Sequence, residues 1–540
     1  MSKSKFLKAL LYPFFLLLGL GGIWTAVNFI GSNVSPGQPA ISRAKEITGI
    51  EYPVDDNGDI EYLQLINAKQ MISIKVDNNA VVPIVRNCDP GILEQYPDSF
   101  FFLLGIARPE SEGQKFEPAT DWIWKNILHQ SNSAGVRGGE KTAGPTAEQF
   151  VEYATNNPWT DDELPELEQW LEAMTDPINE FEKASKRSKF YMPVVAADAD
   201  NAPLMHVQQE LLKYFLDLGP VFMIQANRCL GNRDYEGWLE NVETLYRFGA
   251  LVSKGNSFAN QLYAASLHRT GDTAIASAAK NGKLDPDQLR ELFRKLEDMP
   301  EIEGMPRSIR KGEKWLAYHL LTRCVRESKS EIIARAEPPG LFHSIIFSAA
   351  DFNKVLEIMD NDFEQVASIA ELPKNQMMQA VVDLEAEMEQ RAIKNENPVT
   401  GLFALLGGRT AKGEFAGESL SLMKYPSPQV YCGALHRSTI RNLTKLTIAL
   451  ELYKQEKKKY PDRLEDLAPD FIPGIDRDLF TNDPLIYKVT NEDYALYSCG
   501  FYGADDDGPT GPNAKTFGDV FLRFGPYQRW HEFLEDQLAN

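Results

Sequence analysis

Helical periodicity over about half of the chain is the feature that most restricts its fold. Between residues 146 and 425, apolar residues recur at spacings of three and four, which places them on one face of an α-helix. One such run follows a Thr160–Glu163 capping-box pattern and is interrupted by Asp176-Pro177, where a new helix is expected to start. Its apolar members are Leu164, Leu167, Leu171, Met174, Ile178 and Phe181. The pattern predicts a mainly α fold with a large α-helical domain over 146–430.

Further helices are predicted where good helix formers dominate, at 256–281, 286–298, 307–328, 351–370 and 374–394. Residues 226–238 resemble the turn of a tetratricopeptide unit, but only one convincing instance occurs. Because a solenoid needs about three repeats to bury its faces, a helical bundle or an irregular helical domain is preferred.

The C-terminal part changes character. A helix is predicted over 434–458, with Ile440, Leu443, Leu446, Leu450 and Tyr453 on one side. Short strands are predicted at 485–489, 494–498 and 520–524. One long helix on a short antiparallel sheet is the economical fold. This reading makes 431–524 a small α+β domain and 525–540 a C-terminal tail.

The N-terminus contains a stretch, Ala9–Ile30, without any charged side chain. A membrane-spanning helix needs about 20 such residues, and Lys3, Lys5 and Lys8 precede it. The positive-inside rule then places 1–8 in the cytoplasm and the bulk of the chain outside, with 9–30 as a transmembrane signal anchor. The alternative is a cleaved signal peptide, whose apolar core is usually shorter. The sequence therefore predicts a single-pass cell-membrane protein facing the periplasm, with 31–50 as a linker and 51–145 as a mixed or loop-rich region.

Composition excludes some partners and one type of scaffold. The 56 basic and 77 acidic residues give a formal net charge of -21, which repels phosphate backbones, so no nucleic-acid partner is expected. The five cysteines are widely spaced and odd in number, which excludes a disulfide scaffold. Buried free thiols are expected, and one or two bridges stay open as an alternative.

Several segments of the C-terminal part have the order and spacing of a known module. They are Ala449–Tyr453, Tyr460-Pro461, Asp483–Tyr487, Tyr494–Gly500, Asp505–Gly508 and Gly518–Val520. This stretch resembles the globular head of the major pseudopilin of type II secretion systems. A prepilin peptidase site and an acid within the hydrophobic helix are absent, and some 400 residues separate that helix from the module. The chain is therefore not expected to be a filament subunit. As a whole it resembles large membrane-anchored exported bacterial proteins, which implies no activity.

The resemblance implies a calcium site in the acidic loop. Asp505, Asp507 and Asp519 would supply carboxylates, and Gly503 and Gly508 would permit the turns. Calcium takes six to eight oxygen ligands from such flexible loops. The alternative is a solvated acidic turn that holds no ion.

Other motifs are weaker. Asp55–Asp59 resembles part of a calcium loop, but Ile66 stands at the twelfth position, so an Asx turn is preferred. Gly135–Thr142 imitates a phosphate-binding loop with Glu140 in place of a required glycine. Cys432 and His436 are too few ligands for zinc. His268, His319 and Cys324 fall among apolar residues and are expected to pack in the core.

Two classes of function follow. The absence of a catalytic motif and the helical bulk favour a non-enzymatic interaction or scaffold protein with partners in the cell envelope. The alternatives are an extracytoplasmic hydrolase that acts on a polymer, or a component of a type II secretion-like assembly.

Overall fold

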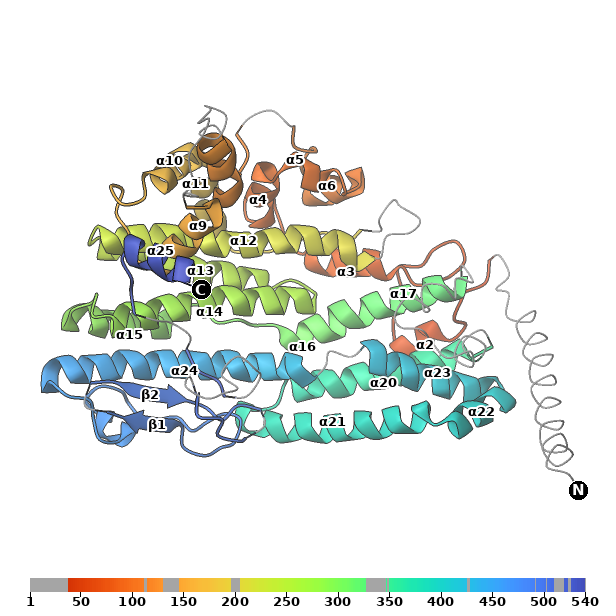
Figure 1. Ribbon diagram of the computed structural model, residues 1–540. Helices are drawn as coiled ribbons and strands as arrows, with labels where there is room; N and C mark the ends of the chain where they lie inside the picture. Colours follow the sequence, from red (N-terminus) through yellow and green to blue (C-terminus); the bar gives the residue numbers. More distant parts are fainter. Residues whose placement is uncertain are drawn as a thin grey trace, which may run out of the picture. The chain divides into compact units, whose positions relative to one another are not determined.

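A computed structural model describes the protein over residues 37–110, 114–129, 145–195, 204–326, 346, 349–424, 428–490, 492–501, 503–508, 519–522 and 526–539. It is mainly helical, and its described strands form one two-stranded antiparallel sheet, as Figure 1 shows. The chain divides into two compact units, each made of two stretches. Unit 1 comprises residues up to Gln70 together with Met305–Gln429, and unit 2 comprises Met71–Gly304 together with Val430–Asn540.

Unit 1 is helical in its described residues. Its elements are α2 (Ala44–Thr48), α3 (Tyr62–Gln70), α16 (Met305–Ser308), the π-helix η2 (Ile309–Glu313), α17 (Lys314–Arg326), α20 (Phe352–Ile369), α21 (Lys374–Glu396), α22 (Pro398–Leu406) and α23 (Arg409–Lys424). Its core includes Tyr318 of α17, whose ring contacts Tyr62 at 5.6 Å and Phe363 at 6.3 Å between centroids. The buried Lys314 ammonium lies 2.6 Å from Asp360 and 2.7 Å from Glu364. The predicted linker is structured from residue 37 onward, because α2 packs on α20.

Unit 2 contains the remaining described helices and the sheet. Its elements are α4 (Val81–Asn87), α5 (Pro90–Leu93), α6 (Asp98–Leu104), α7 (Ala119–Ile123), the π-helix η1 (Trp124–Leu128), α9 (Ala147–Asn156), α10 (Pro165–Ala173), α11 (Thr175–Ser185), α12 (Leu204–Gly231), α13 (Tyr235–Val252), α14 (Phe258–Lys280), α15 (Pro286–Asp298), α24 (Pro428–Lys457), the 3-10 helix η3 (Leu464–Leu467), β1 (Ile486–Val489), β2 (Tyr494–Tyr497) and α25 (Trp530–Ala539).

The starts of several helices in unit 2 follow from their capping residues. Capping boxes precede α9 at Thr146, α14 at Ser257 and α15 at Asp285. The box predicted at Thr160 is wrong, because α10 begins at Pro165 without a side-chain cap. Pro165 instead marks the start of α10, because proline is favoured in the first turn of a helix, where its missing N–H leaves no hydrogen bond unmade. The restart near Asp176-Pro177 is confirmed, since α10 ends at Ala173 and α11 begins at Thr175.

Tryptophans mark the core of unit 2. Trp159, Trp170 and Trp238 are at most 1 % exposed, and the indole N–H of Trp159 donates to the carbonyl oxygen of Ile224 at 3.1 Å. Glycine is required at Gly231, because a Cβ there would lie 2.1 Å from the carbonyl oxygen of Trp159. Burial of these large rings contributes to the stability of the unit.

The C-terminal sheet is small. Ile486 pairs with Tyr497 and Val489 pairs with Tyr494 in the antiparallel ladder of β1 and β2. The third predicted strand is reduced to an isolated bridge between Ser498 and Val520 in the described residues. Ile448 and Leu452 of α24 share one apolar core with residues of α12–α15. The division into units therefore differs from the predicted domain bounds, since 431–524 joins 71–304 and the 146–430 segment is divided after Gly304.

The predicted anchor at 9–30 and the segment 1–8 lie outside the described residues. Among the helices that the structure does describe, none combines the length and the apolar character that a bilayer crossing requires. Cys88, Cys229 and Cys499 are free thiols, and burial raises the pKa of Cys88 to about 12. The side chain of Cys432 lies outside the described part.

Candidate functional site

The acidic loop brings the three predicted carboxylates into one neighbourhood. One oxygen of Asp505 accepts hydrogen bonds from the Tyr497 hydroxyl at 2.8 Å and from the backbone N–H of Asp507 at 2.9 Å. One oxygen of Asp519 accepts from the backbone N–H groups of Asp506 at 3.0 Å and Gly508 at 2.7 Å. The loop is therefore tied to Asp519 through its own backbone.

The charges of this loop are already partly balanced by a cation of the chain. The Lys488 ammonium lies 3.3 Å from Asp505 and 3.4 Å from Asp507. The hydrogen bond from Tyr497 lowers the pKa of Asp505, whereas burial raises the pKa of Asp519. The second carboxylate oxygen of Asp519 is buried and has no hydrogen-bond partner among the described residues. That oxygen suits a cation, but the described residues contain no group of three acidic, histidine or cysteine ligands placed for a metal.

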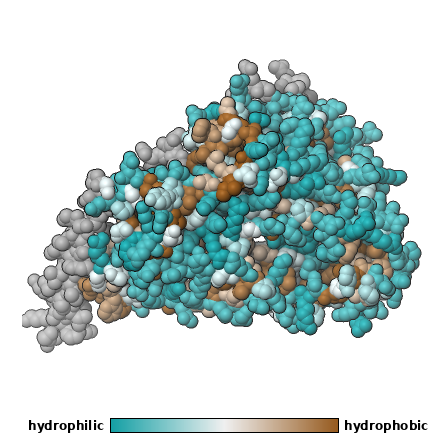
Figure 2. All heavy atoms as spheres, turned by 180° about the vertical axis from the view of Figure 1, so that it is seen from behind, coloured by the Kyte–Doolittle hydropathy of each residue, from teal (hydrophilic) through white to brown (hydrophobic). Residues whose placement is uncertain are grey.

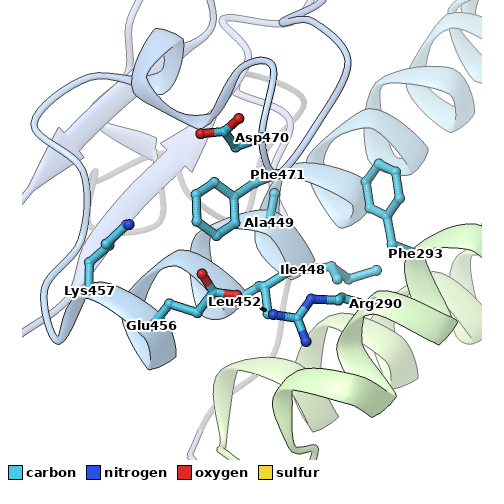
Figure 3. Close-up of a pocket in the computed structure, with 9 residues that line it drawn as sticks. All are labelled: Arg290, Phe293, Ile448, Ala449, Leu452, Glu456, Lys457, Asp470 and Phe471. Atoms are coloured by element: carbon cyan, nitrogen blue, oxygen red, sulfur yellow. Dashed lines mark hydrogen bonds and ion pairs between the residues drawn. The ribbon is translucent and has the colours of Figure 1, made fainter.

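A cavity of about 410 Å³ opens between α15, α24 and the segment that follows η3. Its apolar wall consists of Phe293, Ile448, Ala449, Leu452 and Phe471. Figure 3 shows the rings of Phe293 and Phe471 on opposite sides of the α24 residues Ile448 and Ala449. The volume lies in the lower part of the range for small-molecule sites, which is about 300–1,000 Å³.

Side-chain contacts hold α15 and α24 antiparallel along this cavity. Arg441 donates to the carbonyl oxygen of Leu296 at 3.4 Å, and Gln455 donates to that of Leu284 at 2.9 Å. Residue numbers therefore rise along α24 in the direction in which they fall along α15, so the two helices run antiparallel. Near the far end of α24, Glu456 forms an ion pair with Arg290, which the dashed line in Figure 3 marks.

The mouth of the cavity carries two further charges. Lys457 and Asp470 line it, both are exposed, and neither forms an ion pair with a described residue. Arg290, in contrast, also contacts Asp287 at 2.8 Å. The mouth therefore offers one positive and one negative group that are available to a ligand.

A buried acid lies on the side of α24 that faces β2. Glu451 is 4 % exposed and accepts a hydrogen bond from the Tyr460 hydroxyl at 2.8 Å. Lys454 donates to that hydroxyl at 3.0 Å. Burial raises the pKa of Glu451 to about 7. Lys280 lies 4.0 Å from the ring centroid of Tyr494 and covers this centre from α14.

A second buried polar centre joins α13, α14 and α24. The Tyr246 hydroxyl donates to Asp272 at 2.6 Å, and Arg441 lies over the Tyr246 ring at 4.5 Å. Burial raises the pKa of Asp272 to about 6 and lowers that of His268 to about 3. Asp272 and His268 are 1 % and 2 % exposed. This burial confirms the prediction that His268 packs in the core.

Unit 1 exposes an apolar helix face. On α22, Val399, Phe403 and Leu406 are 55 %, 71 % and 43 % exposed, and Ile393 at the end of α21 is 63 % exposed. The three α22 positions have the i, i+4, i+7 spacing of one helix face. We call these four residues the α22 face. Figure 2 shows how hydrophobic side chains, in brown, reach the surface among hydrophilic ones.

The remaining sequence motifs have the following outcomes. One oxygen of Asp55 accepts hydrogen bonds from the backbone N–H groups of Asn57 and Asp59 at 2.9 Å, so the predicted Asx turn is confirmed. Asp59 forms an ion pair with Arg326. Gly135–Thr142 lies outside the described residues. The side chain of Cys432, four positions before His436, lies outside them as well.

Sequence reasoning missed the cavity, the buried acids and the α22 face. The apolar run of Gly401–Gly407 was the available signal for the face. Glu451 and Asp272 occupy the buried sides of their helices. The residues four positions away are Thr447, Gln455, His268 and Ala276, so the spacing of apolar residues gave no signal for these buried acids.

Comparison with known proteins finds no match: no family model, no curated protein and no solved structure is similar to the chain. The resemblance to the pseudopilin head stays a prediction.

Proposed function

We propose that this chain is a membrane-anchored interaction protein that binds a protein partner of the cell envelope through the α22 face. The anchor is Ala9–Ile30, and the bulk of the chain lies on the extracytoplasmic side. The observation that carries the proposal is the exposure of Val399, Phe403 and Leu406 on one apolar face. Contiguous exposed apolar residues of this kind mark interaction surfaces.

The spacing of the α22 face favours an amphipathic helix as the contacting element of the partner. Helices dock on one another through anchors at i, i+4 and i+7. A lipid surface is disfavoured, because the net charge of -21 opposes approach to anionic headgroups. The partner is therefore expected to supply apolar anchors within a neutral or basic surface.

Site-specific photocrosslinking in native membranes tests this proposal. A photoreactive residue at Phe403 is expected to capture one discrete protein, and the same residue at Leu262 serves as the control. Leu262 is 53 % exposed but lies on α14 in unit 2. The variant Phe403→Ser should reduce capture from a probe at Val399 and leave thermal unfolding unchanged. Capture of lipid, of nothing, or of the same protein from both positions would contradict the proposal.

Calcium binding by Asp505, Asp507 and Asp519 is a second, separate proposal. The buried and unpartnered oxygen of Asp519 supports it, and Lys488 opposes it because its ammonium occupies the side of the loop shared by Asp505 and Asp507. A ligand that binds only the folded state raises the unfolding midpoint. The full chain should therefore melt at a higher temperature in millimolar calcium than in chelator.

Two variants make the calcium test specific. Asp519→Asn should abolish the calcium-dependent shift, whereas Lys488→Met should enlarge it, because it removes the competing cation. If the wild type shows no shift and Lys488→Met shows none either, the loop is a solvated acidic turn.

A further inference from the structure

The cavity between α15 and α24 has an apolar interior and a charged mouth. Its wall is formed by Phe293, Ile448, Ala449, Leu452 and Phe471. Burying apolar ligand surface against such a wall is favourable, although the cost of association must be subtracted from the gain. The interior therefore favours an aromatic or branched aliphatic group.

The mouth determines which polar groups such a ligand should carry. Arg290 is neutralised by Asp287 and Glu456, so it offers little net charge. Lys457 and Asp470 are exposed lining residues that make no ion pair with described residues. A ligand with one carboxylate and one ammonium group complements both of them. A purely anionic amphiphile would pair with Lys457 but bring its negative charge near Asp470. A purely cationic amphiphile would pair with Asp470 but bring its positive charge near Lys457.

We propose that this cavity binds an apolar zwitterion, with the apolar side chain between Phe293 and Phe471, the carboxylate at Lys457 and the ammonium at Asp470. A free apolar amino acid and a short apolar peptide share this chemistry. The proposal does not depend on the proposed function, because the cavity lies in unit 2 and the α22 face lies in unit 1.

Isothermal titration calorimetry of the full chain in detergent-free nanodiscs tests this inference. The probes are L-phenylalanine and the dipeptide Leu-Phe, which distinguish the two sources. N-acetyl-Leu-Phe and Leu-Phe-amide each lack one of the two charges. Loss of either charge should weaken binding about threefold, which is typical of a solvent-exposed ion pair. Equal binding of all three dipeptide forms would overturn the assignment of the charges.

Variants locate the site. Lys457→Met should weaken binding of Leu-Phe about threefold and leave binding of Leu-Phe-amide unchanged, because the amide lacks the carboxylate. Asp470→Asn should likewise weaken binding of Leu-Phe about threefold and leave binding of N-acetyl-Leu-Phe unchanged, because the acetylated form lacks the ammonium group. Lys459→Met is the matched control, because Lys459 is an exposed lysine nearby that does not line the cavity. Ala449→Leu should abolish binding of every probe by filling the interior.

Two further results would refute the proposal. One is that none of the probes binds the wild-type chain at millimolar concentration. The other is that Ala449→Leu binds Leu-Phe as the wild type does. If Ala449→Leu does not fold, the crossed response of the Lys457 and Asp470 variants decides, because these two exposed side chains can change without disturbing the core.

Discussion

Glu451 should make the stability of unit 2 depend on pH in a direction that an exposed glutamate would not. Its pKa is raised by burial from an ordinary value of 4.5 to about 7. The folded state therefore retains a proton that the unfolded chain has lost. The contribution of this group is fully favourable below pH 4.5 and is lost as the pH rises through 7.

The size of the effect follows from the same values. A pKa difference of about 2.5, at roughly 1.4 kcal/mol for each pKa unit, corresponds to about 3 kcal/mol. Glu451→Gln stays neutral at every pH, and its amide oxygen can accept the hydrogen bond that Tyr460 donates. The variant should match the wild type near pH 4.5 and exceed it by about 3 kcal/mol above pH 7.

Urea unfolding at pH 5 and pH 8, followed by hydrogen exchange of the α24 amides, measures this difference. Comparison of variant with wild type at each pH cancels the other titrating groups, provided that they are independent of Glu451. Glu465→Gln is the control, because Glu465 is exposed on η3. A gain for Glu451→Gln that is equal at both pH values, or a loss at pH 8, would refute the reasoning.

Three further changes have defined outcomes. Burial lowers the pKa of His268 to about 3, so the stability that the neutral ring allows is retained above pH 6.5 and lost as the pH falls toward 3. On going from pH 7 to pH 4, His268→Gln should therefore gain about 3 kcal/mol of unfolding free energy over the wild type, measured by urea unfolding at both pH values. Gly249→Ala would place a Cβ 2.2 Å from the His268 ring and should cost about 2 kcal/mol, measured as a lower melting temperature. Lys314→Met leaves Asp360 and Glu364 without their buried cation and should cost about 3 kcal/mol in unit 1; an unchanged urea midpoint would contradict that.

Long helices with clear caps were predictable from the sequence. The range 286–298 coincides with α15, because Asp285 caps it and Pro286 starts it. The range 374–394 differs from α21 by two residues at its end. Local patterns suffice in such cases, since the cap and the periodicity act within a few residues.

Short elements were not predictable in the same way. Val81–Asn87 lies in the region predicted to be mixed or loop-rich and contains three valines, an isoleucine and a proline, yet it forms α4. Its residues Val81, Val82, Ile84 and Val85 are fully buried. Tertiary packing therefore overrides the β preference of the branched side chains.

The candidate sites depend on distances that sequence spacing does not contain. The acidic loop was identified through the resemblance to the pseudopilin head, although Asp519 stands twelve positions after Asp507. The cavity combines Phe293 with Ile448, which are far apart along the chain. Only the antiparallel contact of α15 with α24 brings them together. Lys488 was missed for the same reason, since its position on β1 opposite the loop follows from the strand register.

The discontinuity of unit 2 has a consequence for biosynthesis. Residues 71–304 leave the ribosome before α24 exists, yet Ile448 and Leu452 of α24 complete their core. The 125 residues of Met305–Gln429 must be translated in between. At about 5–20 residues per second this takes roughly 6–25 s. During that interval the apolar side of α15 lacks the α24 residues that cover it, so this apolar surface stays exposed on the nascent chain until α24 has been made.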